Sequence, residues 1–374
     1  MTAFPRHAQA LAALADRGRL RSLAPRVGHD FASNDYLGLA GSDVLRDAAR
    51  AALDRGVAVG AGGSRLLRGN DAEHQALEAM AARHFGTERA LFMGGGFSAN
   101  QAIFASLPMP DDLVLYDALI HASAHDGMRL GRAETLSFAH NDVADAGAQI
   151  AAWRARGGAG RVWLAIESLY SMGGDFSPIA DFAKLATAHD AVLVVDEAHA
   201  TGVYGSTGRG LTEGMDHVPN LLTLHTCGKS LGVSGALICG PAVLIDTLIN
   251  KARGFIYATA PSPLNAALVM AALQHLEANP KRRHAALALI DHAHQQAAQH
   301  GFTGFQSQIM PVLLGSDARV LQVASALQLR GYDIRGIRPP TVPRGTARLR
   351  ISITLNVTVD VVSLMLKDLA EVAA

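Results

Sequence analysis

The sequence predicts an α/β fold in which a large domain with a mostly parallel sheet is followed by a smaller α+β domain. Short apolar runs alternate with helix-like stretches from about residue 88 to residue 240. Glycine-rich turns follow several of these runs, and beyond about residue 250 the pattern changes to a long helix and an alternating strand. Continuous apolar strands separated by helices are typical of a parallel sheet covered on both faces.

The elements follow one another in a regular order. A strand, a turn and a helix are each expected in the segments 89–107, 112–131, 161–175 and 191–205, and "LLTLHTCGKS" and "GALICG" complete the sheet. After residue 250, "INKARGFIYATAPSPLNAALVMAALQHLEA" and "ARVLQVASALQLRGY" predict helices, and "ARLRISIT" predicts a half-buried strand. We therefore expect an N-terminal arm with a helix over 1–45, a large domain over 46–250 and a small domain over 251–374.

The composition excludes several classes of protein. The 374 residues contain 33 basic and 33 acidic side chains, so the formal net charge is zero. Proteins that bind nucleic acid usually carry a basic excess. Two cysteines, Cys227 and Cys239, are too few for a disulfide framework or a Cys-based metal site, and we expect no metal. No apolar run reaches the roughly 18 residues of a membrane span, and the N-terminus lacks a signal peptide's apolar core, so we expect a cytoplasmic protein.

Polar side chains gather where the predicted strands end. In a parallel sheet the carboxyl ends of the strands lie along one edge, where ligands bind. The sequence therefore predicts an active site at that edge, assembled from Asn100, His121, Glu167, Ser171, Asp196, His199 and Lys229.

The segment "VLVVDEAHATG" allows two interpretations. Asp196 could belong to the Walker-B strand of a DEAH-type ATPase, or it could face the pyridine nitrogen of pyridoxal phosphate. "CGKS" at 227–230 resembles the end of a P-loop, but Thr223 stands where the P-loop requires its first glycine. Lys229 also follows Asp196, whereas a Walker A lysine precedes the Walker B aspartate. Because the segment departs from the Walker motifs in both respects, the pyridoxal interpretation is favoured.

The pyridoxal interpretation explains why Lys229 stands among small residues, because a Schiff-base lysine needs a desolvated amine and neighbours that leave room for the cofactor. A surface lysine is the simpler alternative. The turn "MGGGFSANQAI" opens a helix whose N-terminal N–H groups could bind phosphate, although a plain tight turn fits equally well. Thr226 offers a further hydroxyl. His121 and His125 have equal claims to a catalytic role on this basis.

The chain closes with "IRGIRPPTVPRGTARLRISIT". Its prolines exclude a helix, and in the strand that follows Arg348 and Arg350 share one face with Ser352 and Thr354. Arginine suits bidentate capture of a carboxylate. An ordinary half-exposed strand would show the same alternation.

Taken together, six motifs match one family in order: "SNDYLGLA", "GGSRLLRGN", "GGFSANQA", "SLYSMGGD", "DEAHATGVYG" and "TCGKSLGVSG". The chain resembles the α-oxoamine synthases. These are PLP-dependent acyltransferases with fold type I of the PLP-dependent transferases, and they are similar to the class-II aminotransferases. This resemblance implies a mostly parallel seven-stranded sheet, a pyridoxal 5'-phosphate cofactor and a homodimer with its active site at the interface. The chain departs from the family at Gly173, where aspartate is usual, in "HTCGKS" and in "IES" at 166–168.

The resemblance also implies a role for each matching residue. The catalytic residues would be Lys229, Asp196 and His121. Lys229 would form the Schiff base, and Asp196 would hold the pyridine nitrogen protonated. His121 would stack on the ring and contact the substrate. The cofactor would further contact Gly96, Phe97, Ser171, His199 and Thr226, with Thr259 reaching the partner subunit's phosphate. The substrates would contact Asn34 and Arg350 at the amino-acid carboxylate, and Arg21, Arg338 and Thr341 at the acyl group.

Within the family, "IRPPTVPRGTARLRISIT" and "FAHND" are most similar to the members that condense L-alanine with a pimeloyl thioester, carried on coenzyme A or on acyl carrier protein. The first alternative is another α-oxoamine synthase that uses glycine or serine with a different acyl group. The DEAH-type ATPase is the alternative of a different class.

Overall fold

The computed structural model describes residues 3–23 and 25–373 of the chain. By contacts, these residues form two compact units. Unit 1 consists of the described residues up to Ser33 together with those from Leu289 onward, and unit 2 runs from Asn34 to Ala288. Helix α11 (Pro280–Gln299) begins in unit 2 and ends in unit 1.

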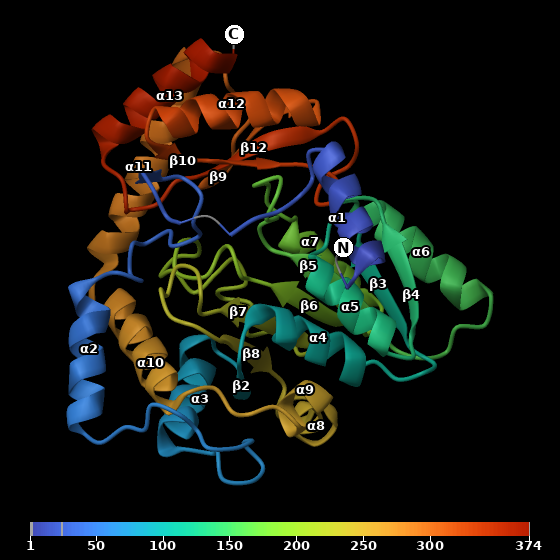
Figure 1. The fold of residues 1–374 in the computed structure, drawn as a ribbon. Coiled ribbons are helices and arrows are strands. Elements are labelled where there is room, and N and C mark those ends of the chain that lie inside the picture. Colours follow the sequence, from blue (N-terminus) through green and yellow to red (C-terminus); the bar gives the residue numbers. More distant parts are fainter. Residues whose placement is uncertain (1–2, 24, 374) are drawn as a thin grey trace. The chain divides into compact units, whose positions relative to one another are not determined.

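Unit 2 is built on a sheet that has seven strands within the described residues, in the order β2-β8-β7-β6-β5-β3-β4 (Figure 1). Strands β3 to β7 pair in parallel, whereas β8 is antiparallel to both of its neighbours, β2 and β7. The sheet is thus mostly parallel, as predicted. The strands are β2 (Arg89–Met93), β3 (Leu113–Asp117), β4 (Glu134–Phe138), β5 (Val162–Glu167), β6 (Val192–Asp196), β7 (Leu221–Thr226) and β8 (Ala236–Gly240).

Helices cover both faces of this sheet, so each central strand is apolar on both sides. Val194 packs in one core cluster with side chains of α4 (Gly96–Ser106), α5 (Ala122–Leu130) and α8 (Ala242–Lys251). Its neighbour Val195 packs in a second cluster with α6 (Val143–Ala155) and α7 (Ile179–Ala188). This alternation explains the unbroken apolar run "VLVV" in the sequence.

The remaining helices of unit 2 are α2 (Asp43–Asp54), α3 (Ala72–His84), α9 (Arg253–Ile256) and α10 (Pro263–Ala278). The Ser42 side chain caps α2, and Asp71 caps α3. Helix α10 packs against α2 and α3. Because of this packing, residues 251–288 belong to unit 2 by contacts, whereas the sequence analysis placed them in the small domain.

Unit 1 contains an antiparallel sheet in the order β11-β12-β9 and the short parallel pair β1-β10. The strand predicted from "ARLRISIT" is β12, which lies between its two neighbours and is buried on both faces over most of its length. The elements are α1 (Pro5–Asp16), β1 (His29–Asp30), β9 (Ile309–Gly315), α12 (Asp317–Leu329), β10 (Tyr332–Asp333), β11 (Arg335–Ile337), β12 (Ala347–Ser352) and α13 (Val359–Ala373). No helix among the described residues is both long and apolar enough to cross a membrane.

Candidate active site

A cavity of about 180 Å³ lies at the carboxyl ends of the parallel strands of unit 2. Strands β5, β6 and β7 end at Glu167, Asp196 and Thr226, and the turns that follow β3 and β7 add His121 and Lys229. The cavity is lined by Gly96, Phe97, Asn100, His121, Ser123, Glu167, Asp196, Ala198, His199, Thr226 and Lys229. Nine of the residues proposed from the sequence therefore meet in one cavity: Gly96, Phe97, Asn100, His121, Glu167, Asp196, His199, Thr226 and Lys229.

Lys229 ends a chain of hydrogen bonds that holds its amine in the cavity wall. Its Nζ lies 2.8 Å from Nε2 of His199, and Nδ1 of the same ring lies 2.6 Å from the Tyr36 hydroxyl. That hydroxyl in turn donates to Oδ1 of Asn34 at 3.0 Å. Tyr36 and His199 are both buried, so this chain fixes the position of the amine from the protein side.

Asp196 is held as an acceptor by neighbours on two elements. Its Oδ2 accepts from Nδ2 of Asn100 at 2.7 Å, and its Oδ1 accepts from the backbone N–H of Ala198 at 2.9 Å. Asn100 also donates to Oγ of Ser123 at 3.0 Å. These two donors fix the orientation of the carboxylate, which can then accept a hydrogen bond from a protonated ring nitrogen.

His121 is neutral in this setting. Its Nδ1 lies 2.8 Å from the Ser123 hydroxyl and accepts the Ser123 backbone N–H at 3.2 Å. Desolvation of the ring lowers the pKa of His121 below its usual value, and the charge of Lys229 lowers it further while Asp196 opposes the change. Because Nδ1 accepts, the single proton of the neutral ring resides on Nε2.

Glu167 is buried beside Asp196 on the neighbouring strand. Its Oε2 accepts the backbone N–H of Ser171 at 3.2 Å, and its Oε1 has no hydrogen-bond partner among the described residues. Burial raises the pKa of Glu167 well above its usual value, and the carboxylate of Asp196 adds to the rise. Burial next to a second carboxylate therefore favours the protonated form of Glu167.

The residues around the cavity fit pyridoxal phosphate. Helix α4 begins at Gly96 without a side-chain cap, so its first N–H groups remain available for an anion. A Cβ at position 96 would lie 2.7 Å from Oγ1 of Thr226, which shows how closely that hydroxyl approaches the helix N-terminus. A phosphate site, a carboxylate for the ring nitrogen and the Lys229 amine thus surround one cavity.

The glutamate of "DEAH" does not reach this cavity. Glu197 is buried, and its carboxylate accepts from the Ser168 hydroxyl at 2.6 Å and from the backbone N–H groups of Leu211 and Thr212 at 3.1 and 2.6 Å. This side chain therefore anchors the loop after β6, and nothing in its contacts supports the nucleotide-hydrolysis interpretation.

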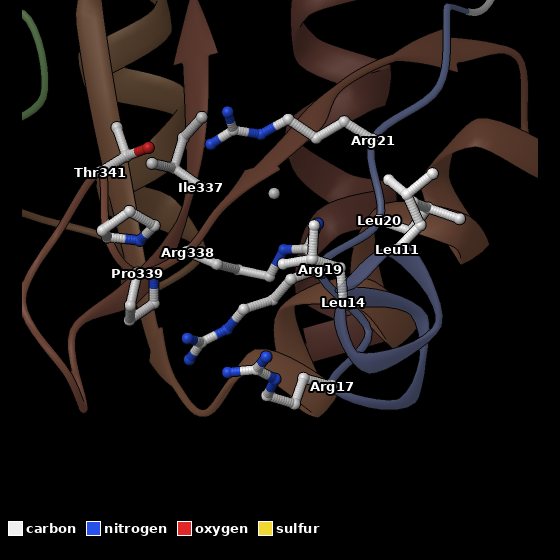
Figure 2. Close-up of a pocket in the computed structure, with 12 residues that line it drawn as sticks. Leu11, Leu14, Arg17, Arg19, Leu20, Arg21, Ile337, Arg338, Pro339 and Thr341 are labelled. Carbon is white, nitrogen blue, oxygen red and sulfur yellow. The ribbon is translucent and has the colours of Figure 1, made fainter. Parts of the chain in front are cut away.

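The other residues proposed from the sequence lie elsewhere. Ser171 is buried next to Glu167 but does not line the cavity, and Asn34 reaches its wall through Tyr36. Thr259 is exposed and lies outside the cavity lining. In unit 1, Arg350 is buried on β12 and donates to Oγ of Ser352 at 2.9 Å, and a second pocket is lined in part by Arg21, Arg338 and Thr341 (Figure 2).

Two residues that contribute to the site, Tyr36 and Ser123, were absent from the predicted set. Tyr36 orients His199, and Ser123 links His121 to the Asn100 amide that holds Asp196. Asn100, after the glycine turn, and Glu167, at a strand end, were predicted from those places in the sequence. Tyr36 lies 163 positions from His199, and no local pattern indicates that contact.

Comparison with known proteins agrees with this geometry. Residues 27–364 match the family model described as aminotransferase class I and II. The 8-amino-7-oxononanoate synthase of Anaeromyxobacter dehalogenans is 40% identical, with 92% of this chain and 89% of the relative covered. The enzyme of the same name from Methylobacterium nodulans is 42% identical, with 86% and 81% covered.

Solved structures show the same fold. Sphingomonas wittichii serine palmitoyltransferase superposes with a TM-score of 0.89 at 25% identity over 100% of this chain and 98% of the other. The 8-amino-7-oxononanoate synthase of Francisella tularensis superposes with a TM-score of 0.75 at 26% identity, covering 92% and 97%. The chain therefore belongs to the aminotransferase class I and II family, and within it to the PLP-dependent α-oxoamine synthases of fold type I.

Proposed function

We propose that this chain is an acyltransferase that condenses L-alanine with a pimeloyl thioester and releases carbon dioxide and the thiol carrier. This is the reaction of 8-amino-7-oxononanoate synthase, an enzyme of biotin synthesis, and it is supported by the relatives of that name. The cofactor is pyridoxal 5'-phosphate. The observation that carries the proposal is the convergence of Lys229, Asp196 and the uncapped N-terminus of α4 on one cavity.

The residues around the cavity would hold the cofactor from three sides. The N–H groups of Gly96 and Phe97, with the Thr226 hydroxyl, would bind the phosphate. Asp196 would keep the ring nitrogen protonated, with Asn100 holding that carboxylate in place. When bound, pyridoxal phosphate withdraws electrons from the Cα of the amino acid.

Lys229 would act as the base. Its amine would remove the proton from Cα of alanine, and Cα would then form a bond to the thioester carbonyl carbon as the thiol departs. Loss of the original carboxylate as carbon dioxide leaves Cα to receive a proton again from Lys229. His121, with its proton on Nε2, would donate to the substrate across the cavity.

Substrate selection and assembly complete the proposal. Asn34 and Arg350 would bind the carboxylate of alanine, since a guanidinium can grip a carboxylate bidentately. Arg21, Arg338 and Thr341 would bind the acyl substrate. We further propose a cytoplasmic homodimer in which Thr259, exposed on this chain, contacts the partner subunit's cofactor.

The test supplies the purified holoenzyme with L-alanine, glycine or L-serine, each together with pimeloyl-CoA or another acyl-CoA, and identifies the products by mass spectrometry. Condensation with L-alanine and release of carbon dioxide are expected. Turnover only with glycine or serine and another acyl-CoA would assign a sister activity of the family. Lys229→Ala is expected to abolish turnover, whereas Lys184→Ala, on an exposed lysine paired with Asp181, serves as the matched control.

A further inference from the structure

His225 is a buried histidine on β7 that does not line the active-site cavity. It lies in "HTCGKS", one of the segments in which the chain departs from the family, and its residue surface is 1% exposed. The next residue, Thr226, lines the cavity. Because successive side chains of a strand point to opposite faces of the sheet, His225 points away from the cavity. An imidazole is buried at little cost only where both of its nitrogens find hydrogen-bond partners.

Two threonines provide these partners. Nδ1 of His225 lies 2.8 Å from the hydroxyl of Thr201, and Nε2 lies 2.9 Å from the hydroxyl of Thr223. The Thr201 hydroxyl donates its own proton to the carbonyl of Glu197 at 2.8 Å, so it accepts from Nδ1–H. Nε2 then accepts from Thr223, whose other acceptor, the carbonyl of Cys239, is more distant at 3.5 Å. The ring is neutral, since desolvation lowers the pKa of His225 to about 3.

The orientation of the ring is also fixed. Phe85, which follows the last residue of α3, stacks on the imidazole with the ring centroids 3.6 Å apart and an angle of 16° between the planes. The two hydrogen bonds define the plane of the imidazole, and the stack covers one of its faces. Thr201 and Thr223 are themselves buried. His225 therefore provides a rigid attachment point for Thr201.

Thr201 belongs to the turn that presents His199 to the cavity. His199 contacts Nζ of Lys229 through its Nε2 at 2.8 Å. Within the described chain, backbone hydrogen bonds between β6 and β7 extend as far as the N–H of Glu197. Beyond that point, the hydrogen bond from His225 to Thr201 connects the turn of His199 to the strand that leads to Lys229.

We propose that His225 is a positioning residue of the active site, which holds the turn of His199 through Thr201 and so sets the contact between His199 and the Lys229 amine. The inference deepens the proposed function and rests on it, because Lys229 is the proposed base. Nδ1–H carries this role, whereas Nε2 satisfies Thr223. An amine whose hydrogen-bond partner is displaced changes its orientation and its proton affinity. Loss of the Nδ1–H donor therefore slows proton removal from Cα and leaves substrate binding unchanged.

The contacts of the two ring nitrogens can be removed separately. The side-chain amide of asparagine reaches the place of Nδ1, and that of glutamine reaches the place of Nε2. His225→Asn therefore keeps a donor for Thr201, and His225→Gln keeps a partner for Thr223, while both variants lose the stack on Phe85. Thr201→Val and Thr223→Val divide the same contacts without a change at the histidine.

Steady-state kinetics of the holoenzyme with L-alanine and pimeloyl-CoA give kcat and KM for the four variants. His225→Gln and Thr201→Val should lower kcat about fivefold, as for loss of one neutral hydrogen bond, with KM for alanine changed less than about twofold. The conservative variant His225→Asn and the control Thr223→Val should keep kcat within about twofold of the wild-type value. Equal losses of kcat in the two pairs, or a loss confined to His225→Asn and Thr223→Val, would overturn the proposal.

The visible absorbance of the holoenzyme provides a readout independent of turnover. The pH at which the cofactor band changes should move by about 0.7 pH unit in His225→Gln and Thr201→Val, the shift that corresponds to a factor of about five in proton binding. It should stay in place in His225→Asn and Thr223→Val. An unmoved band in all four variants would overturn the role of His225. A wild-type protein that does not condense alanine would instead refute the proposed function, and the comparison of absorbances would still decide the role of His225.

Discussion

His140 is predicted to stabilise the loops around the active site in a pH-dependent way. Its Nδ1 lies 2.9 Å from Oδ1 of Asp117, at the end of β3, and its Nε2 lies 2.7 Å from Oδ2 of Asp175, four residues after Ser171. Hydrogen bonds to these two carboxylates outweigh desolvation and raise the pKa of His140 to about 9. The Tyr170 ring packs edge-on against the imidazole at 4.4 Å, and Asn141 donates to both aspartates.

The magnitude follows from linkage between protonation and folding. A rise from 6.5 to about 9 corresponds to about 3 kcal/mol at about 1.4 kcal/mol per pH unit. The side chain is 28% exposed, and solvent screening reduces the expected effect to about 1–2 kcal/mol. Because the folded-state pKa is raised, this stability is fully present below pH 6.5 and is lost as the pH rises through about 9.

The assay measures the free energy of unfolding in urea for the wild-type protein and His140→Gln at pH 6.0 and pH 9.5. We expect the variant to be less stable by about 1–2 kcal/mol at the lower pH and the difference to shrink at the higher pH. His217→Gln, on an exposed histidine, serves as the control. A difference of the same size at both pH values would refute the reasoning, since an uncharged hydrogen bond would then account for it.

Three further predictions concern the cavity of unit 2. Gly96→Ala should weaken binding of pyridoxal phosphate about tenfold, because its Cβ would lie 2.7 Å from the Thr226 hydroxyl. Gly94→Ala is the control, since a Cβ at that position meets nothing within 4 Å. Equal cofactor affinities of the two variants in a titration would contradict this prediction. Tyr36→Phe should lower kcat about two- to tenfold by removing the hydrogen bond to His199, as for one neutral hydrogen bond, and an unchanged kcat would remove Tyr36 from the site. Asp196→Asn should lower kcat at least about 100-fold, while the affinity for pyridoxal phosphate falls far less. Steady-state kinetics at saturating cofactor measure kcat, and a larger loss of cofactor affinity than of kcat would contradict this prediction.

The fold could be predicted from the sequence wherever strands are continuously apolar. Strands β5, β6 and β7 are buried on both faces, and their runs of valine, leucine and isoleucine are visible without a structure. Strand β4 was not predicted, because it pairs only with β3 at the edge of the sheet and most of its residues are not buried. The antiparallel insertion of β8 between β2 and β7 was also not visible, since strand order depends on contacts distant in sequence.

The candidate site, like the fold, could be predicted from the sequence only in part. Lys229, Asp196 and Thr226 follow directly from their places at strand ends and in the turn after β7. The partners that orient them come from other elements, as Asn100 does from α4, and only the folded chain brings them together. The raised pKa of Glu167 depends on its burial beside Asp196, and this follows from the pairing of β5 with β6 in the folded chain.

The central claim is that the amine of Lys229 binds the aldehyde of pyridoxal phosphate. The most direct measurement reduces the holoenzyme with borohydride, digests it and locates the pyridoxyl-modified lysine by mass spectrometry. The account predicts modification at Lys229 and none at the other lysines of the sequence, Lys184, Lys251, Lys281 and Lys367. Modification at one of those four instead, or at no lysine, would contradict it.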